Sequence, residues 1–344
     1  MKSAHAVFFD LNKAFDTVPH NPLLHKLSEH QIDPFLIRWV RNYLMDRTQS
    51  VVLGGAQSDS LPVMSGVPQE SVLGPLLFLI YIDGVSSSVV NSKITLYADD
   101  IALHKIIKNP RDYTLFQEDI NSLCIWIANN HLILNILKCC YIVFSRKQHS
   151  AVPDIPLYVG DSHQLAKEDH IKYLGVTFTS DLTWFHHINS VCKKTRRLIG
   201  MLYRNFSKFS DSTVLLKFYK SLIRPHLEYA SVAWDPHLIK DVKLIEDVQK
   251  FALRVCSKTW NSSYDSLLRS CNLSALSDRR KTLKLCLLYN ILSDRSFILI
   301  HPLKNLLVNI RAGTLTAYSC LCSSGELKIS NIRSSLQPLP CGTP

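Results

Sequence analysis

The sequence predicts an α+β fold, with an antiparallel sheet carrying helices on one face in the first half of the chain and a helical region after it. Two observations predict the sheet: an apolar run that ends on Asp10, and two apolar runs that flank Asp99 and Asp100. A third observation predicts the helices, because apolar residues recur at helical spacing from Trp184 onward. The length of 344 residues is enough for two or three domains.

The acids at the ends of the predicted strands form the first candidate site. The strand at residues 6–9 delivers Asp10 to its end, and Asp99 and Asp100 are expected at the bend of a hairpin. Neighbouring carboxylates repel each other and are not buried unpaired, so a divalent cation such as Mg²⁺, which prefers oxygen ligands, is a natural partner. Two strands that bring acids to one sheet edge could build a two-metal site about 4 Å across. The alternative is a solvated Asp-Asp turn.

The remaining elements of the first half follow from spacing and turn residues. Two helices are expected on either side of Asp33-Pro34, and an antiparallel strand pair around Gly54-Gly55. An apolar helix is expected from about Gly74 to Ile82, after a loop whose Gly66 and Pro68 would let a nucleotide or template base approach closely. Farther on, the pattern predicts a helix at 113–130, a strand at 140–145 and hairpins between 150 and 179.

The second half of the chain is helical and basic. Helices are predicted at 187–204, 212–223, 235–257 and 264–294, while residues 313–344, rich in Ser and Pro, are expected to be loose. The whole chain has a formal net charge of +11, and residues 191–260 alone hold 14 basic against 6 acidic residues. Such a helical surface could bind the phosphates of a duplex without reading bases. Trp234 and Tyr229 are expected in the core.

Composition excludes several other classes of protein. No window holds about 18 uncharged apolar residues, and the first residues lead directly into a strand instead of a signal sequence, so we expect an intracellular protein, cytoplasmic or nuclear. The ten cysteines are scattered and form no C-x-x-C pair, which argues against a zinc site.

The order of these short motifs resembles a known enzyme family. Phe9-Asp10 with Ala14-Phe15-Asp16, then Gly66-Val67-Pro68-Gln69, then Tyr97-Ala98-Asp99-Asp100, resemble the catalytic motifs of a reverse transcriptase. Tyr173-Leu174-Gly175-Val176 and the run from Leu222 to Ala230 resemble the later palm and thumb of non-LTR (LINE-type) retrotransposon polymerases. The resemblance covers roughly residues 5–260, and the ordered set is far more specific than any one tetrapeptide.

This resemblance implies a domain organisation and a set of partners. It implies a palm with partial fingers at residues 1–182, a basic helical thumb at 183–260, and a helical extension with a loose tail at 261–344. The implied activity is RNA-directed DNA polymerisation, with an RNA template, a DNA primer and dNTP as partners, no membrane and no identified protein partner.

The resemblance also implies residue roles in the chemistry. Asp10, Asp99 and Asp100 would hold two Mg²⁺ ions, or Mn²⁺ in their place. Phe15 would pack beneath the sugar and exclude a 2′-hydroxyl, Gly66, Pro68 and Gln69 would line the nucleotide site, and Lys138 would steady the leaving pyrophosphate or give it a proton. From spacing alone, Phe15 could equally be a core residue and Lys138 a solvated strand-end lysine, and Asp16 a turn or cap residue.

Nucleic-acid contacts are implied at two further places. Leu174 and Gly175 lie in a turn that resembles the primer grip, and the basic residues of the first thumb helix are candidates for phosphate contacts: Lys193, Lys194, Arg196 and Arg197. The alternatives are an ordinary edge hairpin and a solvated helix face.

Two departures from the family pattern leave other functions open. Glu70 stands where the family has a glycine, and a carboxylate there would be repelled by phosphates. Only nine residues precede Asp10, where the family has a basic fingers segment, so we expect a fragment of a longer protein or an eroded copy. The main alternative is therefore an inactive palm-thumb remnant that binds RNA or RNA–DNA duplex. A viral RNA-dependent RNA polymerase or an intron-encoded maturase is the second alternative.

Overall fold

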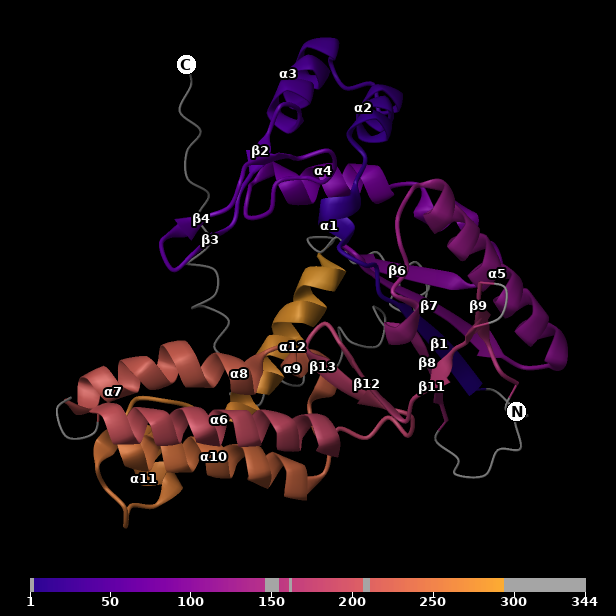
Figure 1. The fold of residues 1–344 in the computed structure, drawn as a ribbon. Helices are drawn as coiled ribbons and strands as arrows, with labels where there is room; N and C mark the ends of the chain where they lie inside the picture. Colours follow the sequence, from indigo (N-terminus) through magenta and orange to yellow (C-terminus); the bar gives the residue numbers. More distant parts are fainter. Residues whose placement is uncertain (1–2, 146–154, 161–162, 207–210, 294–344) are drawn as a thin grey trace. The chain divides into compact units, whose positions relative to one another are not determined.

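The computed structural model describes residues 3–145, 155–160, 163–206 and 211–293. The chain divides into two compact units, Met1–Ser190 and Val191–Pro344, and the boundary falls inside helix α6, Phe185–Phe206 (Figure 1). The predicted loose tail at 313–344 lies outside the described residues. None of the helices in the described parts of the chain is long and apolar enough to cross a membrane.

A five-stranded sheet with the strand order β11-β8-β1-β7-β6 is the centre of the first unit. Its strands are β1 (Ser3–Phe9), β6 (Lys93–Tyr97), β7 (Asp100–Ile107), β8 (Cys140–Phe144) and β11 (Ala166–Lys167). The predicted strand before Asp10, the hairpin at Asp99 and the strand at 140–145 are confirmed. The prediction of a purely antiparallel sheet is wrong at one edge, because β11 pairs with β8 in parallel. Between β8 and β11 the chain forms the separate β9–β10 pair, and β11 then runs beside β8 in the same direction.

One face of the sheet carries the hydrophobic core of the first unit. Val7 and Phe9 on β1 and Ile101 and Leu103 on β7 are buried in one cluster with residues of helices α4 (Leu73–Ile82) and α5 (Pro110–Asn129) (Figure 1). Because side chains alternate along a strand, Phe8 and Ala102, which lie opposite each other in the β1–β7 register, point to the other face. The predicted helical layer on one face is present.

The other elements of the first unit are short. The helices are α1 (Ala14–Thr17), α2 (His20–Glu29), α3 (Pro34–Leu44) and the 3₁₀ turns η1 (Val85–Ser88) and η2 (Ile136–Lys138). The paired strands are β2 (Thr48–Gln49) with β5 (Leu61–Pro62), β3 (Val52–Leu53) with β4 (Ala56–Gln57), β9 (Tyr158–Val159) with β10 (His163–Gln164), and β12 (His170–Tyr173) with β13 (Val176–Thr179). The sequence predicted α2, α3 and the strand pair around Gly54 because caps, turn residues and periodicity agree there.

In the residues that the structure describes, the regular elements of the second unit are helices. Besides the end of α6, it contains α7 (Ser212–Phe218), a π-helical segment (Tyr219–Ile223), α8 (Arg224–Glu228), α9 (Ser231–Trp234), α10 (Ile239–Ser257), α11 (Tyr264–Ser270) and α12 (Leu276–Leu292). Trp234 is fully buried, as expected, and its indole N–H donates to the carbonyl of Tyr229. The expectation for Tyr229 was wrong, because this side chain is 58 % exposed.

Two predicted helices of the second half differ in detail. The helix predicted from Asp235 begins at Ile239, because Asp235-Pro236 separates it from α9. The single helix predicted at 264–294 is two helices, since the chain turns at Cys271 and restarts at Leu276. Glu246 of α10 accepts hydrogen bonds from the backbone N–H of Leu276 and of Ser277, which caps the second helix from outside.

Candidate active site

Three acids from distant parts of the sequence come together at one end of the central sheet. The antiparallel register places Phe9 opposite Ile101, so Asp10, which follows Phe9, lies next to Asp100 at the start of β7. Alternation puts the side chains of Asp10 and Asp100 on the face opposite the core. Asp99 lies in the two-residue turn that joins β6 to β7. We call Asp10, Asp99 and Asp100 the carboxylate corner.

The turn of the β6–β7 hairpin fixes the position of Asp99. Tyr97 pairs with Asp100, which leaves only Ala98 and Asp99 in the loop. Ala98 has a φ of 53°, as tight hairpin turns require, although glycine or asparagine usually occupies such a position. The hairpin therefore presents both acids at its tip, as the apolar runs on each side predicted.

The charges in the carboxylate corner act on one another. Burial raises the pKa of Asp100 above its ordinary value, and the negative charges of Asp99 and Asp10 raise that pKa further. All three side chains are only partly buried, so solvent reaches the corner. Among the described residues, no three His, Cys, Asp or Glu side chains are close enough together to hold a metal ion. The three acids therefore lie at one end of the sheet without forming a closed set of metal ligands.

Lys138 is the counter-charge of this corner. Its ammonium nitrogen lies 3.5 Å from Oδ2 of Asp10, and the two side chains are 68 % and 40 % exposed. The 3₁₀ turn η2 that carries Lys138 is attached to the acid strand, since the backbone N–H of Asn135 donates to the carbonyl of Asp10 at 2.8 Å. An exposed ion pair of this kind contributes little to stability. It does place a mobile cation beside the acids.

The loop at 65–69 is bound to the segment that follows Asp10. The backbone N–H of Gly66 donates to the carbonyl of Val18, that of Val67 donates to the carbonyl of Phe15, and Nε2 of Gln69 donates to Oδ1 of Asp16 at 2.7 Å. Gly66 has a φ of 91°, and a Cβ there would lie 2.8 Å from the backbone of Asp16. Only glycine fits this approach. The predicted nucleotide-site residues of the two motifs thus meet in space.

Phe15, Pro68 and Glu70 complete this region. The ring of Phe15 stacks on Phe78 of α4 with centroids 4.5 Å apart, and Phe15 is partly buried. Pro68 is also partly buried, and its carbonyl lies against Gly74 at the start of α4. Glu70 is exposed and has a φ of 55°, in the left-handed region that favours glycine. The backbone here is thus one that the glycine of the family pattern would adopt without strain.

The remaining sequence candidates lie elsewhere. Leu174 and Gly175, with φ of 46° and 79°, form the two-residue turn between β12 and β13, and both are exposed. The basic residues of α6 belong to the second unit and are all exposed: Lys193, Lys194, Arg196 and Arg197. On the same helix Cys192, Thr195 and Ile199 are buried, so the basic side chains form the solvent face of an amphipathic helix.

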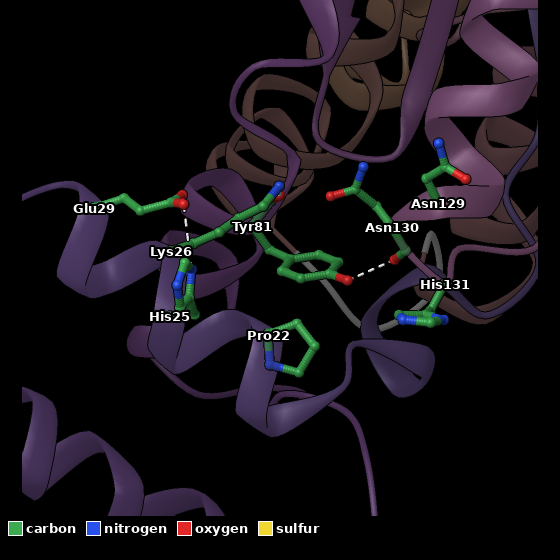
Figure 2. Close-up of a pocket in the computed structure, with 8 residues that line it drawn as sticks. All are labelled: Pro22, His25, Lys26, Glu29, Tyr81, Asn129, Asn130 and His131. Carbon is green, nitrogen blue, oxygen red and sulfur yellow. Dashed lines mark hydrogen bonds and ion pairs between the residues drawn. The ribbon is translucent and has the colours of Figure 1, made fainter.

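A separate pocket in the first unit is lined by residues that contact one another. Figure 2 shows Tyr81 of α4 with its hydroxyl donating to the carbonyl of Asn130. The ammonium of Lys26 on α2 donates to the carbonyl of Tyr81 and lies 4.8 Å and 5.0 Å from the ring centroids of Tyr81 and Trp126. Burial lowers the pKa of Lys26 and raises that of Tyr81 to about 12. These contacts join α2, α4 and α5, which is a structural role.

Sequence reasoning missed two groups near the site. The Nε2 of His20 lies 2.9 Å from the carbonyl oxygen of Gly66 and helps to hold the loop. Tyr173 was read only as part of a turn motif, yet its ring packs on Phe8 beside the carboxylate corner. Neither contact leaves a periodic signal, because each joins residues that are far apart in the chain.

Comparison with known proteins agrees with this arrangement of motifs. Residues 1–178 match the family described as reverse transcriptase (RNA-dependent DNA polymerase). The RNA-directed DNA polymerase from mobile element jockey of Drosophila melanogaster is 27 % identical over 290 residues, which are 80 % of this chain and 31 % of that protein. The jockey polymerase of Drosophila funebris is 31 % identical over 241 residues, 66 % of this chain and 25 % of that protein.

Two more distant proteins resemble the chain. The Pol polyprotein of the type-1 retrotransposable element R2 of Popillia japonica is 27 % identical over 246 residues, 66 % of this chain and 38 % of that protein. A telomerase structure from Candida tropicalis covers 77 % of this chain and 43 % of its own, with 13 % identity and a TM-score of 0.43, which is too distant for any conclusion about function.

The chain spans about a third or less of the length of the jockey polymerases that it matches. The family match nevertheless covers more than half of the chain and includes the carboxylate corner, Lys138 and the loop at 65–69. Enzymes of this family generally use divalent metals. The chain therefore belongs to the reverse transcriptase family, among the RNA-directed DNA polymerases of non-LTR (LINE-type) retrotransposons.

Proposed function

We propose that this chain carries the nucleotidyl-transfer centre of an RNA-directed DNA polymerase, which joins a dNTP to the 3′-hydroxyl of a DNA primer on an RNA template. The observation that carries the proposal is the carboxylate corner. Three acids separated by about ninety positions meet at one sheet end, and the charges of two of them raise the pKa of the third. A cluster of acids with raised pKa is more typical of a functional site than of a structural one.

The donor chemistry of the corner fits hard divalent cations. Asp10, Asp99 and Asp100 offer carboxylate oxygens, which Mg²⁺ prefers, and they would hold two Mg²⁺ ions or Mn²⁺ in their place. Bound there, the ions would lower the pKa of the primer hydroxyl and neutralise charge on the leaving pyrophosphate. Lys138, which already lies 3.5 Å from Asp10, would give the pyrophosphate a second positive group and a proton.

The loop at 65–69 and Phe15 would bind the nucleotide. Gly66 packs against the backbone of Asp16 and Gln69 is oriented by its hydrogen bond to Asp16, so the loop is held next to the segment that carries Phe15. Phe15, fixed from behind by Phe78, would lie beneath the sugar and leave no room for a 2′-hydroxyl. This role would favour dNTP over rNTP.

The domain organisation that we propose follows the family. Residues 1–182 would be the palm with partial fingers, 183–260 the thumb, and 261–344 an extension. In the thumb, the exposed face formed by Lys193, Lys194, Arg196 and Arg197 would hold the phosphates of the template–primer duplex. The turn at Leu174 and Gly175 would contact the primer as a grip.

Primer extension tests the proposal directly. The chain, with a primed RNA template, dNTP and Mg²⁺, is compared with the Asp99→Ala variant. We expect incorporation by the unaltered chain and a loss of at least about a thousandfold in the variant, because one of the carboxylates that would hold the divalent cations is removed. Equal, negligible incorporation by both proteins would reject catalysis by this chain.

A second candidate function is a non-catalytic remnant that binds RNA or RNA–DNA duplex. Glu70 favours it, because this side chain adds negative charge and a strained backbone where the family has a glycine. Duplex binding that falls steeply with salt, together with no incorporation, would support this candidate.

A further inference from the structure

The hydroxyl of Tyr173 is buried and has no hydrogen-bond partner among the residues that the structure describes. Leaving a polar atom unsatisfied in a protein interior destabilises the fold. Most such atoms in native proteins have a partner, and an exception calls for a reason of its own, such as a catalytic role. The ring alone does not explain the choice of tyrosine, since phenylalanine would pack in the same way.

The fold places this hydroxyl on the face of the sheet that carries the acids. The ring of Tyr173 packs against Phe8, with centroids 5.0 Å apart and planes inclined by 58°. Phe8 lies opposite Ala102, and alternation puts Phe8, Asp10, Ala102 and Asp100 on one face. The hairpin of β12 and β13 therefore covers the sheet directly behind the carboxylate corner.

The hairpin holds Tyr173 in a defined position. Tyr173 pairs with Val176, so it closes the two-residue turn at Leu174 and Gly175, whose positive φ values fix the turn geometry. Electrostatics agree with the placement, because burial and the charge of Asp100 both raise the pKa of Tyr173. The phenol thus lies within electrostatic reach of one acid of the corner.

We propose that Tyr173 is a positioning residue of the metal site: when a divalent cation is bound, its hydroxyl donates a hydrogen bond to Asp100, directly or through one water, and orients that carboxylate. This inference rests on the proposed function, because it assumes that the carboxylate corner binds metal. The turn at Leu174 and Gly175 would then have a second role besides primer contact, because its hairpin would also position an acid of the carboxylate corner.

The test is Mn²⁺ binding, measured by calorimetry without nucleotide or primer, in the unaltered chain and in Tyr173→Phe. Loss of a partner that orients a metal ligand typically weakens affinity 10- to 100-fold, and we expect about tenfold here. Tyr43→Phe, which removes a hydroxyl from α3, is the matched control and should bind Mn²⁺ as the unaltered chain does. In Asp100→Asn the hydroxyl of Tyr173 has no carboxylate to orient. Adding Tyr173→Phe to that variant should therefore not change its Mn²⁺ affinity further.

A stability measurement separates positioning from packing. Because the hydroxyl is unsatisfied in the metal-free chain, Tyr173→Phe should leave the urea midpoint in EDTA unchanged or raise it, while Mn²⁺ affinity falls. Unchanged Mn²⁺ affinity in Tyr173→Phe, where Asp99→Asn abolishes binding, would overturn this inference and leave the proposed function standing. Mn²⁺ binding by the unaltered chain that does not depend on Asp99 would overturn both.

Discussion

The acidic side chains around Arg280 in the second unit are mostly buried and paired, but those in the carboxylate corner of the first unit are only partly buried. In the second unit, Asp235 and Glu246 are mostly buried and both face Arg280, which is 1 % exposed, with nitrogen–oxygen distances of 2.7 Å and 3.9 Å. In the carboxylate corner of the first unit, the three acids are only partly buried, and exposed Lys138 pairs with Asp10.

The difference indicates what each group of charges is for. Buried acids that stabilise a fold need partners within the chain, because an unpaired buried charge costs several kcal/mol. The network around Arg280 meets that need, and Glu246 also accepts from Tyr264 and from the first N–H groups of α12. The carboxylate corner has only the exposed Lys138 beside Asp10, and its acids are partly open to solvent, so these charges do little to stabilise the fold.

The largest effect on stability is expected from Arg280→Leu. The change removes the guanidinium that Asp235 and Glu246 share and leaves Asp235 only its ion pair with Lys284, and breaking a buried pair in this way costs about 3 kcal/mol. Lys281→Leu on the same helix is the matched control, because Lys281 pairs with Asp278 at an exposed site and its loss should cost less than about 0.5 kcal/mol. Urea unfolding followed by circular dichroism measures both, and equal midpoints would contradict the assignment.

Gly66→Ala tests the packing that joins the loop at 65–69 to the segment after Asp10. A Cβ at this position meets the backbone of Asp16 at 2.8 Å in addition to requiring a φ of 91°, and we expect a loss of about 2–3 kcal/mol. Gly84→Ala is a close control, with a φ of 88° and no atom within 4 Å of the added carbon. It should cost only about 1 kcal/mol. Similar losses of unfolding free energy in the two variants would show that backbone strain alone, without the contact to Asp16, accounts for the cost of the added Cβ.

Glu70→Gly should improve the same loop. Glycine adopts a φ of 55° without strain, so the variant should gain up to about 1 kcal/mol of unfolding free energy. Glu70→Gln keeps the strained backbone and removes only the charge, and it should leave stability unchanged. If the two variants raise dNTP incorporation equally, charge and not backbone is what limits the site; if only glycine raises it, backbone geometry limits it.

The sequence predicted those parts of the fold that leave a local pattern. The strand before Asp10 and the hairpin at Asp99 were predicted because apolar residues alternate or cluster up to a polar end. The parallel pairing of β11 with β8 was not, since register between distant strands depends on contacts and not on periodicity. For the same reason the break between α11 and α12 was missed: the cap that restarts the chain at Leu276 comes from Glu246, thirty positions earlier.

The candidate site shows the same limit. The apolar runs predicted that Asp10, Asp99 and Asp100 come to one sheet end, and the charges of Asp99 and Asp10 do act on Asp100, while Lys138 lies 3.5 Å from Asp10. The hydroxyl of Tyr173 and the contact from His20 to Gly66 were invisible, since a single polar atom on an otherwise apolar or turn residue carries no signal of its own.

The smallest and sharpest effect concerns the charge of Asp100 in the absence of metal. Its folded pKa is raised, so the folded chain holds this proton more tightly than the unfolded chain does. The stability that protonation provides is therefore present at low pH and lost as pH rises through the folded pKa. Asp100→Asn removes the repulsion at every pH. In EDTA, the free energy of unfolding of this variant should therefore exceed that of the unaltered chain by roughly 0.5 kcal/mol at about pH 7 and should equal it at about pH 3.

Asp112 supplies a control of opposite sign. Its carboxylate accepts backbone N–H bonds from Lys108 and Asn109 at the start of α5, and these bonds lower its pKa. The carboxylate of Asp112 therefore stabilises the fold above its unfolded pKa, and this stabilisation is lost as pH falls. The Asp112→Asn variant should be less stable than the unaltered chain at neutral pH and equally stable in acid. If Asp100→Asn instead followed the course of Asp112→Asn, the carboxylate corner would be neutralised within the chain after all. In that case its acids would serve the fold, as those of the second unit do.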